Sequence, residues 1–128
     1  MQRDRLAVWL GAYERLWRTA GSEGLGEIFA EDVVYSMGPY EQAAKGLREL
    51  SELWERERVS PDEQFEISTE IVAVEGDTGV ARVDVRYGPP REQEYKDLWV
   101  IRLDAEGRCV SFEEWPFWPE EDTPPPAA

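Results

Sequence analysis

The sequence predicts a single α+β domain, with helices in the first half of the chain and a curved antiparallel sheet in the second. In the first half, apolar residues recur three and four positions apart, which is typical of amphipathic helices. From residue 65 onward apolar and polar residues alternate, which is typical of strands with one buried face. A chain of 128 residues, 41% of them hydrophobic, can bury one core of its own.

Three helices are expected. The first covers residues 4–19, and its apolar face consists of Leu6, Trp9, Leu10, Tyr13, Leu16 and Trp17. Ser22 is a suitable N-cap for a short second helix that contains Leu25, Ile28 and Phe29. The third runs from Leu47 to Arg58, and Ser60-Pro61-Asp62 ends it. Its apolar positions, again on one face, are Leu47, Leu50, Leu53 and Trp54.

The strands begin with a short β-prone segment at residues 33–37, and the segment that follows it, residues 40–45, is expected to be a loop. Two long strands, residues 65–74 and 79–87, flank a turn. A loop at residues 88–91 then leads into a hairpin from Glu94 to Trp118. We expect residues 1–118 to form the domain, and the acidic, proline-rich residues 119–128 to form a disordered tail.

Asp97 is the unusual residue of this hairpin. It alternates with Tyr95, Trp99, Ile101 and Leu103 on the more apolar face of the strand, which we expect to look inward. A carboxylate on an inward face must be paired, protonated or used by a site. Asp97 is therefore a candidate functional residue.

The turn of the hairpin decides which side chain lies opposite Asp97. A four-residue loop at residues 104–107 places Glu114 there, with Cβ atoms about 5 Å apart. Two carboxylates that close cannot both ionise cheaply, so one of them should have a raised pKa. We favour this loop because it buries Val110 and Phe112.

The alternative turn is a three-residue loop with a glycine bulge at Gly107. It turns Glu113 and Trp115 inward and buries Cys109 and Ser111 instead.

The composition excludes several kinds of site. The chain has no histidine, so histidine-based triads and histidine-ligated zinc are ruled out, and no metal or cofactor is predicted. The 28 acidic residues outnumber the 14 basic ones, and the resulting net charge of −14 repels nucleic acid and anionic membranes. No stretch is long and apolar enough to span a membrane. One cysteine, Cys109, cannot form an internal disulfide, so a cytoplasmic location is expected.

The chain resembles the nuclear transport factor 2-like superfamily in the order of its elements and in three motifs. These motifs are FAEDVVY at residues 29–35, GPY at residues 38–40 and DAEGRCVSFEEW at residues 104–115. More narrowly, the chain is similar to its polyketide cyclase-like and ketosteroid isomerase-like branch from Leu6 to Trp118. The resemblance implies a cone-shaped, cystatin-like roll of three N-terminal helices on a curved antiparallel sheet, with an internal pocket, often as a homodimer through the sheet. The superfamily includes isomerases, cyclases, dehydratases and hydrolases, so the fold alone does not choose an activity.

The resemblance to ketosteroid isomerase carries over only in part. It implies an oxyanion-binding role for Tyr13, but it puts Met37 at the place of the catalytic base and Trp99 at the place of the second oxyanion acid. Met37 cannot take a proton, and Trp99 donates only through its indole N–H. Whether the chain is an enzyme therefore stays open.

Three functions are compatible with the sequence. The one we favour is a small-molecule-binding domain with an aromatic-lined pocket for a small, mostly apolar ligand. The second is an enzyme of the isomerase, cyclase or hydratase type, in which Tyr13 donates a hydrogen bond and Asp97 or Glu114 is the general acid or base. The third is a dimeric protein-interaction module. The candidate ligand-binding residues are Trp9, Tyr13, Trp17, Asp32, Tyr35, Met37, Tyr40, Trp54, Trp99, Phe112 and Trp115.

Structural roles compete with these functions. Asp97 and Glu114 can be solvated, or neutralised by Arg86 or Arg91. The aromatic residues of the first helix can simply form the core. Asp32 can hydrogen-bond the backbone where the helical half meets the first strand.

Overall fold

The computed structural model of the protein describes residues 2–57, 64–88 and 92–119. In these ranges the helices are α1 (Arg3–Trp17), α2 (Leu25–Ile28) and α3 (Gly46–Glu57). The strands are β1 (Phe29–Ser36), β2 (Ala44–Lys45), β3 (Phe65–Glu75), β4 (Thr78–Tyr87), β5 (Gln93–Leu103) and β6 (Cys109–Phe117). The α+β order that the two periodicities predict is therefore confirmed.

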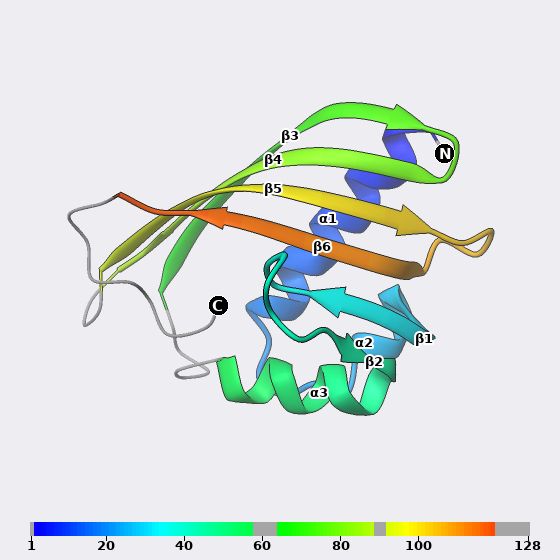
Figure 1. Ribbon diagram of the computed structural model, residues 1–128, viewed down its shortest axis with the longest axis horizontal. Helices are drawn as coiled ribbons and strands as arrows, with labels where there is room; N and C mark the ends of the chain where they lie inside the picture. Colours follow the sequence, from blue (N-terminus) through cyan, green and yellow to red (C-terminus); the bar gives the residue numbers. More distant parts are fainter. Residues whose placement is uncertain (1, 58–63, 89–91, 120–128) are drawn as a thin grey trace.

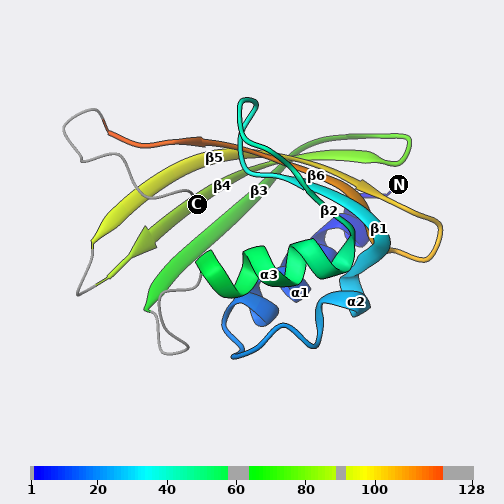
Figure 2. The same cartoon turned by 60° about the horizontal axis from the view of Figure 1, so that its bottom comes forward.

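The six strands form one sheet in the order β2-β1-β6-β5-β4-β3. All neighbouring pairs are antiparallel except β1 and β6, which are parallel. The four long strands, β3 to β6, curve together (Figure 1), and the three helices lie on one side of the sheet (Figure 2). This is the predicted cone-like arrangement of helices on a curved sheet.

The burial pattern of β4 and β5 follows the predicted alternation. Ala81, Val83 and Val85 are buried on β4, and the odd-numbered residues of β5 from Tyr95 to Leu103 are buried with them. The helix α1 approaches the sheet closely at Gly79, where a Cβ atom would lie 2.5 Å from Cδ2 of the buried Leu6. A glycine at this point lets the helix pack directly onto β4.

Two local predictions need correction. Phe29 begins β1 instead of continuing α2, because its backbone is already extended, with φ of −116° and ψ of 141°. The expected loop at residues 40–45 contains the two-residue strand β2, which pairs with Val34 and Tyr35 of β1. The predicted break near residues 58–63, the loop residues 89–91 and the predicted tail from residue 120 onward lie outside the described residues.

The turn between β5 and β6 is the three-residue loop that we did not favour. The backbone N–H of Asp104 donates to the carbonyl of Arg108 at 2.8 Å, and Gly107 adopts a φ of 86° between them. The Asp104 carboxylate accepts hydrogen bonds from the backbone N–H groups of Glu106 and Arg108, at 2.9 and 3.0 Å. These two bonds, together with a glycine able to adopt a positive φ, stabilise the tighter turn.

A bulge immediately after the turn shifts the pairing by one residue. Leu103 pairs with Cys109, whereas Arg102 pairs with Ser111, so Val110 is the extra residue. Cys109 is fully buried and Val110 only half-buried, the reverse of what we expected.

The shorter loop shifts β6 by one residue and the bulge shifts it by one more, so from Phe112 onward the predicted face of β6 points inward. Phe112 and Glu114 are buried. Their partners on β5 differ, however. Glu114 lies opposite Trp99, and Asp97 lies opposite Pro116, so the predicted direct pairing of Asp97 with Glu114 is wrong.

Candidate functional site

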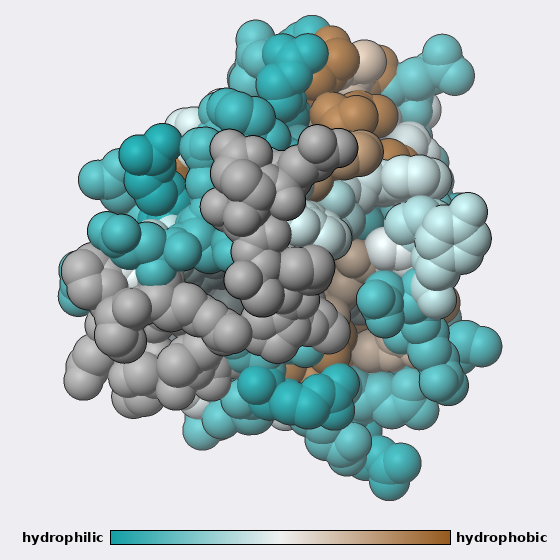
Figure 3. Space-filling view, turned by 60° about the vertical axis from the view of Figure 1, so that its left-hand side comes forward, coloured by the Kyte–Doolittle hydropathy of each residue, from teal (hydrophilic) through white to brown (hydrophobic). Residues whose placement is uncertain are grey.

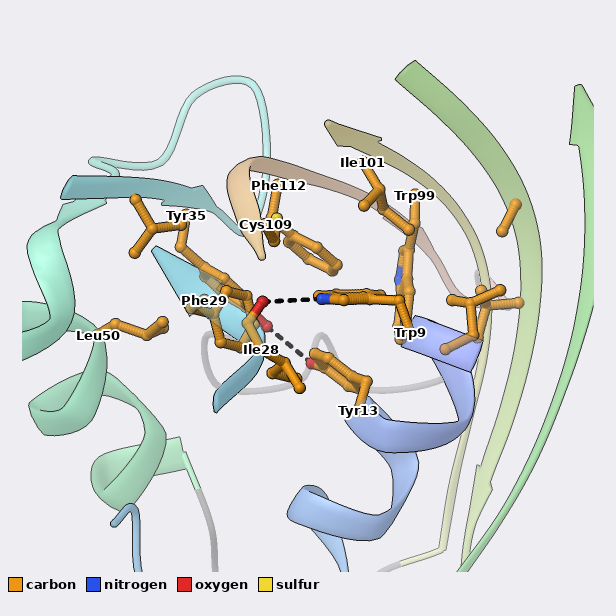
Figure 4. Close-up of a cluster of buried hydrophobic side chains, with 14 of the residues drawn as sticks. Trp9, Tyr13, Ile28, Phe29, Tyr35, Leu50, Trp99, Ile101, Cys109 and Phe112 are labelled. Carbon is orange, nitrogen blue, oxygen red and sulfur yellow. Dashed lines mark hydrogen bonds between the residues drawn. The ribbon is translucent and has the colours of Figure 1, made fainter. Parts of the chain in front are cut away.

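An aromatic cluster fills the space between α1, α3, β1 and the sheet (Figure 4). We use this name for Trp9, Tyr13, Phe29, Tyr35, Trp54, Trp99 and Phe112, all of which are buried. Tyr13 lies at its centre, with ring centroids 4.8 Å from Trp99, 5.3 Å from Trp54 and 5.8 Å from Phe112, onto which it stacks. Six of these seven residues are candidates from the sequence.

Two hydrogen bonds are drawn at this cluster in Figure 4. The indole N–H of Trp9 donates to the backbone carbonyl of Ile28 at 2.9 Å. The hydroxyl groups of Tyr13 and Tyr35 are hydrogen-bonded to each other at 2.8 Å. Burial raises the pKa of both phenols well above the usual value, so both remain neutral and can act as hydrogen-bond donors.

Asp97 lies next to the aromatic cluster, on the inward face of β5. Its side chain is buried, with the residue 5% exposed. Oδ2 accepts a hydrogen bond from the indole N–H of Trp99 at 3.1 Å, whereas Oδ1 makes no hydrogen bond of good geometry to the described residues. Burial raises the pKa of Asp97 to about 7, against the opposing effects of the Trp99 hydrogen bond and of the backbone of Phe117, which lies close enough to lower the pKa without forming a well-aligned bond. This carboxyl group therefore gains and loses its proton near neutral pH.

Glu114 is the second buried carboxyl group, at 8% exposure. Because Glu114 faces Trp99, it is the diagonal neighbour of Asp97 on the same face of the sheet. Diagonal neighbours lie about 7–8 Å apart. Burial raises the pKa of Glu114 well above the usual range, and the charges of Asp97 and Glu57 raise it further. The two carboxyls predicted in the interior are therefore both there, but as diagonal neighbours and not directly opposite each other.

Three further residues belong to this environment, and the list of candidates from the sequence omits them. Tyr87 and Tyr95 pack edge to face with ring centroids 6.0 Å apart, and Tyr87 acts electrostatically on Tyr13. Both lie on the inward, odd-numbered positions of their strands, so the alternation could have identified them. Glu57 follows Trp54 by three residues, which places it on the inner face of α3.

Of the other candidate residues, three lie apart from the aromatic cluster and two lie at the edge of the core. Tyr40 is fully exposed, and Asp32 is exposed on β1. Trp115 lies on the outer face of the sheet, where its indole N–H donates to Glu113. Met37 and Trp17 are partly buried at the edge of the core, Trp17 with its ring 4.8 Å from Trp54.

Neutralisation of the carboxyls by Arg86 is not observed. Arg86 forms an ion pair with Glu94 at 3.2 Å on the outer face of the sheet. Arg91, the other predicted partner, lies outside the described residues.

A separate cavity of about 740 Å³ opens on the surface between the N-terminal end of α3 and the β5–β6 turn. Its charged lining residues are Glu31, Lys45, Arg48, Glu49, Asp104, Glu106 and Arg108. Both signs are mixed there, and Arg108 and Glu106 already pair with each other at 2.8 Å. This cavity offers no selective chemistry comparable to the buried carboxyls.

The part of the chain that the structure describes contains no group of three side chains able to hold a metal ion. Within the same ranges, none of the helices has the length and apolar character needed to cross a membrane. Figure 3, which faces the end where β5 begins and β6 ends, shows mostly hydrophilic side chains with smaller hydrophobic areas between them.

The curved sheet with the helices on one side of it defines a domain of the nuclear transport factor 2-like class. A family model, the SnoaL-like domain, matches residues 10–112. The chain therefore belongs to the SnoaL-like domain family, and the resemblance inferred from the sequence motifs is confirmed. A search of curated proteins finds no match.

Several solved structures share the fold at low sequence identity. An LEH-like epoxide hydrolase from M. tuberculosis has a TM-score of 0.66 at 13% identity, over 89% of this chain and 84% of that one. A candidate SnoaL-like polyketide cyclase from Jannaschia sp. CCS1 has a TM-score of 0.65 at 15% identity, over 84% of both chains. A candidate ketosteroid isomerase from Kribbella flavida DSM 17836 has a TM-score of 0.67 at 18% identity, over 96% of this chain and 84% of that one.

Proposed function

We propose that this domain binds a small, mostly apolar molecule between the aromatic cluster and the carboxyl groups of Asp97 and Glu114. The observation that carries the proposal is Oδ1 of Asp97, a buried acceptor without a partner among the described residues. A buried polar group without a partner costs about 1–3 kcal/mol. A ligand that donates a hydrogen bond there would recover that free energy, and the surrounding aromatic rings would contact its apolar part.

The relatives by fold agree with this proposal. By their names, the similar structures are a hydrolase, a candidate cyclase and a candidate isomerase, and such activities require a small molecule to enter the domain.

The single cysteine is buried and its pKa is raised to about 12, which makes it unreactive. A chain with a single cysteine has no internal disulfide, and this is the observation that favours the cytoplasmic location that we propose.

A fluorescent ligand tests the proposal directly. N-phenyl-1-naphthylamine is neutral and apolar, and we expect it to bind saturably at one site per chain. The variant Trp99→Ala should change its affinity at least tenfold, because an inner wall is removed, whereas Trp115→Ala on the outer face should leave it unchanged. Absence of saturable binding, or equal effects of the two variants, would contradict the proposal.

A second candidate function is proton transfer on a bound carbonyl compound. It is favoured by the pKa of Asp97 near 7 and by the neutral, hydrogen-bonded hydroxyl groups of Tyr13 and Tyr35. In this function Asp97 or Glu114 takes a proton from carbon while Tyr13 donates to the carbonyl oxygen. Deuterium exchange into the α-positions of 2-tetralone, followed by NMR, should then exceed the buffer rate and fall to it in Asp97→Asn. Exchange at the buffer rate with the unaltered protein would argue against this function for such ketones.

We also propose that the domain is a homodimer through the outer face of the sheet. On β5 and β6 this face exposes Leu98, Trp115 and Phe117, and Leu98 lies directly opposite Trp115. The neighbouring outer faces of β3 and β4 carry ion pairs instead, such as Arg82 with Glu70. An apolar surface flanked by charged side chains is the usual anatomy of a protein–protein interface.

A further inference from the structure

We infer that the molecule bound in this site carries a protonated amine, held between the carboxylates of Asp97 and Glu114. The inference rests on the proposed function and adds the chemical class of the ligand. It depends on the spacing of the two carboxyls, on the charges around them and on the aromatic rings beside them.

The spacing suits a single ammonium group. Asp97 and Glu114 are diagonal neighbours, which places their backbones about 7–8 Å apart and their side chains on one face. Hydrogen bonds from an ammonium to a carboxylate are about 2.7–2.9 Å long. One nitrogen can therefore bond to both carboxylates, and Oδ1 of Asp97 is the acceptor still lacking a donor.

The charges around the site are acidic or neutral. The charge of Asp84 raises the pKa of Asp97, and the charge of Glu57 raises the pKa of Glu114. The two carboxyls in turn raise the pKa of Tyr13. The basic residues of the neighbouring strands are engaged on the outer face, Arg86 with Glu94 and Lys96 with Asp84. Within the described residues, no basic side chain is among the groups that act on the two carboxyls. Burial favours the neutral form of both carboxyls, and a bound ammonium would favour their ionised form instead.

The aromatic rings supply the rest of an amine site. Trp99 donates its indole N–H to Asp97, and the ring of Tyr13 lies 4.8 Å from that of Trp99, so aromatic surface for the apolar part of an amine lies beside the carboxyl group. The indole N–H of Trp54, whose ring lies 5.3 Å from that of Tyr13, is also buried and has no partner among the described residues.

A neutral alcohol fits these observations less well. Its hydroxyl group donates one hydrogen bond, so it can satisfy only one of the two carboxyl groups. An ammonium donates up to three and supplies the opposite charge.

Three probes with the same apolar body separate these cases: 4-phenylbutylamine, 4-phenylbutanol and 4-phenylbutyrate. Calorimetry at pH 7 should show the amine binding at least tenfold more tightly than the alcohol, and the carboxylate binding more weakly than either. Asp97→Asn and Glu114→Gln should each remove most of the preference for the amine. Glu113→Gln, a change at the adjacent and outward-facing carboxylate, should leave that preference intact. Circular dichroism checks that each variant is folded.

Each result supports or contradicts the inference. Equal affinity for amine and alcohol would overturn it while leaving the proposed function in place. Loss of the preference in Glu113→Gln as well would also overturn it, because the effect would then come from surface charge. Failure of all three probes to bind, while N-phenyl-1-naphthylamine binds, would overturn the amine inference alone. Failure of all four would overturn the proposed function with it.

Discussion

Trp99 donates its indole N–H to Asp97, two residues earlier on the same inward face of β5, at 3.1 Å. The bond fixes one oxygen of a buried carboxyl group and leaves the other unpartnered among the described residues. Burial and hydrogen bonding act in opposite directions on this group, and burial has the larger effect, because the pKa of Asp97 is raised to about 7. The stability of the protein should therefore depend on pH.

Stability should fall as pH rises from 4 to 8. The folded-state pKa of Asp97 is about 7 and its ordinary value is 3.8, so the folded protein binds this proton more tightly than the unfolded chain. The stabilisation is complete below pH 3.8 and is lost as pH rises through 7, with a size of a few kcal/mol. Urea denaturation at pH 5 and pH 8 measures the difference.

The variant Asp97→Asn isolates this contribution. It removes the titrating group, so the difference between pH 5 and pH 8 should shrink, and the variant should be relatively more stable at pH 8. Glu113→Gln changes the net charge equally but on the exposed face, and should keep the dependence of the unaltered protein. An unchanged dependence in Asp97→Asn would show that other groups cause the effect, either Glu114, whose pKa is also raised, or the rising net negative charge of the whole chain.

The hydroxyl groups of Tyr13 and Tyr35 should be strongly coupled. Tyr13→Phe leaves the Tyr35 hydroxyl buried without its partner, which should cost about 1–3 kcal/mol, and Tyr35→Phe should do the same. The double variant removes both groups and should cost less than the sum of the two single changes. Denaturation of all four proteins measures the coupling energy. Simple additivity would contradict the hydrogen bond.

Two glycine substitutions should have opposite effects. Gly107→Ala forces a side chain into a φ of 86° at the β5–β6 turn and should destabilise the protein by about 1–2 kcal/mol. Gly11→Ala, within α1, meets nothing closer than an arginine side chain at 3.5 Å and should stabilise by about 0.5–1 kcal/mol. Thermal unfolding compares the two. Similar effects would mean that the tight turn is not retained in solution.

Trp115→Glu should convert the proposed dimer to a monomer without unfolding it. The change places a charge opposite Leu98, at the centre of the apolar outer face of β5 and β6. Val72→Glu is the matched control, because Val72 is also exposed but lies on β3, at the far end of the strand order from β1 and β2. Sedimentation at micromolar concentration tells the states apart, and a monomeric unaltered protein would refute the proposal.

Most of the fold could be predicted from the sequence because its two halves have distinct periodicities. The spacing of Trp9 and Tyr13 on a helix and the alternation from Tyr95 to Leu103 each depend only on local geometry, so both are confirmed. The parallel pairing of β1 with β6 depends on contacts between residues far apart in sequence, and no local pattern specifies it.

The sequence predicts which face of a strand each site residue occupies, but not which residue lies opposite it on the neighbouring strand. Which side of β5 Asp97 occupies follows from alternation alone. Which residue lies opposite depends on two local features, the Asp104 side chain in the turn and the bulge at Val110. Their effects on the inward face of β6 cancel, so the four-residue loop, although wrong, correctly predicted that Glu114 would be buried. The predicted register of β5 and β6 was wrong because it included neither the hydrogen bonds of the Asp104 side chain nor the bulge at Val110.

The bulge at Val110 also decides which residues of β6 face the interior. If the bulge were lost while the number of residues stayed the same, the pairing of Leu103 with Cys109 would continue along the strand, and every later residue of β6 would change face. Glu113 and Trp115 would then enter the interior in place of Phe112 and Glu114. A single bulge in the hairpin therefore determines which of two adjacent carboxyl groups, Glu113 or Glu114, belongs to the interior.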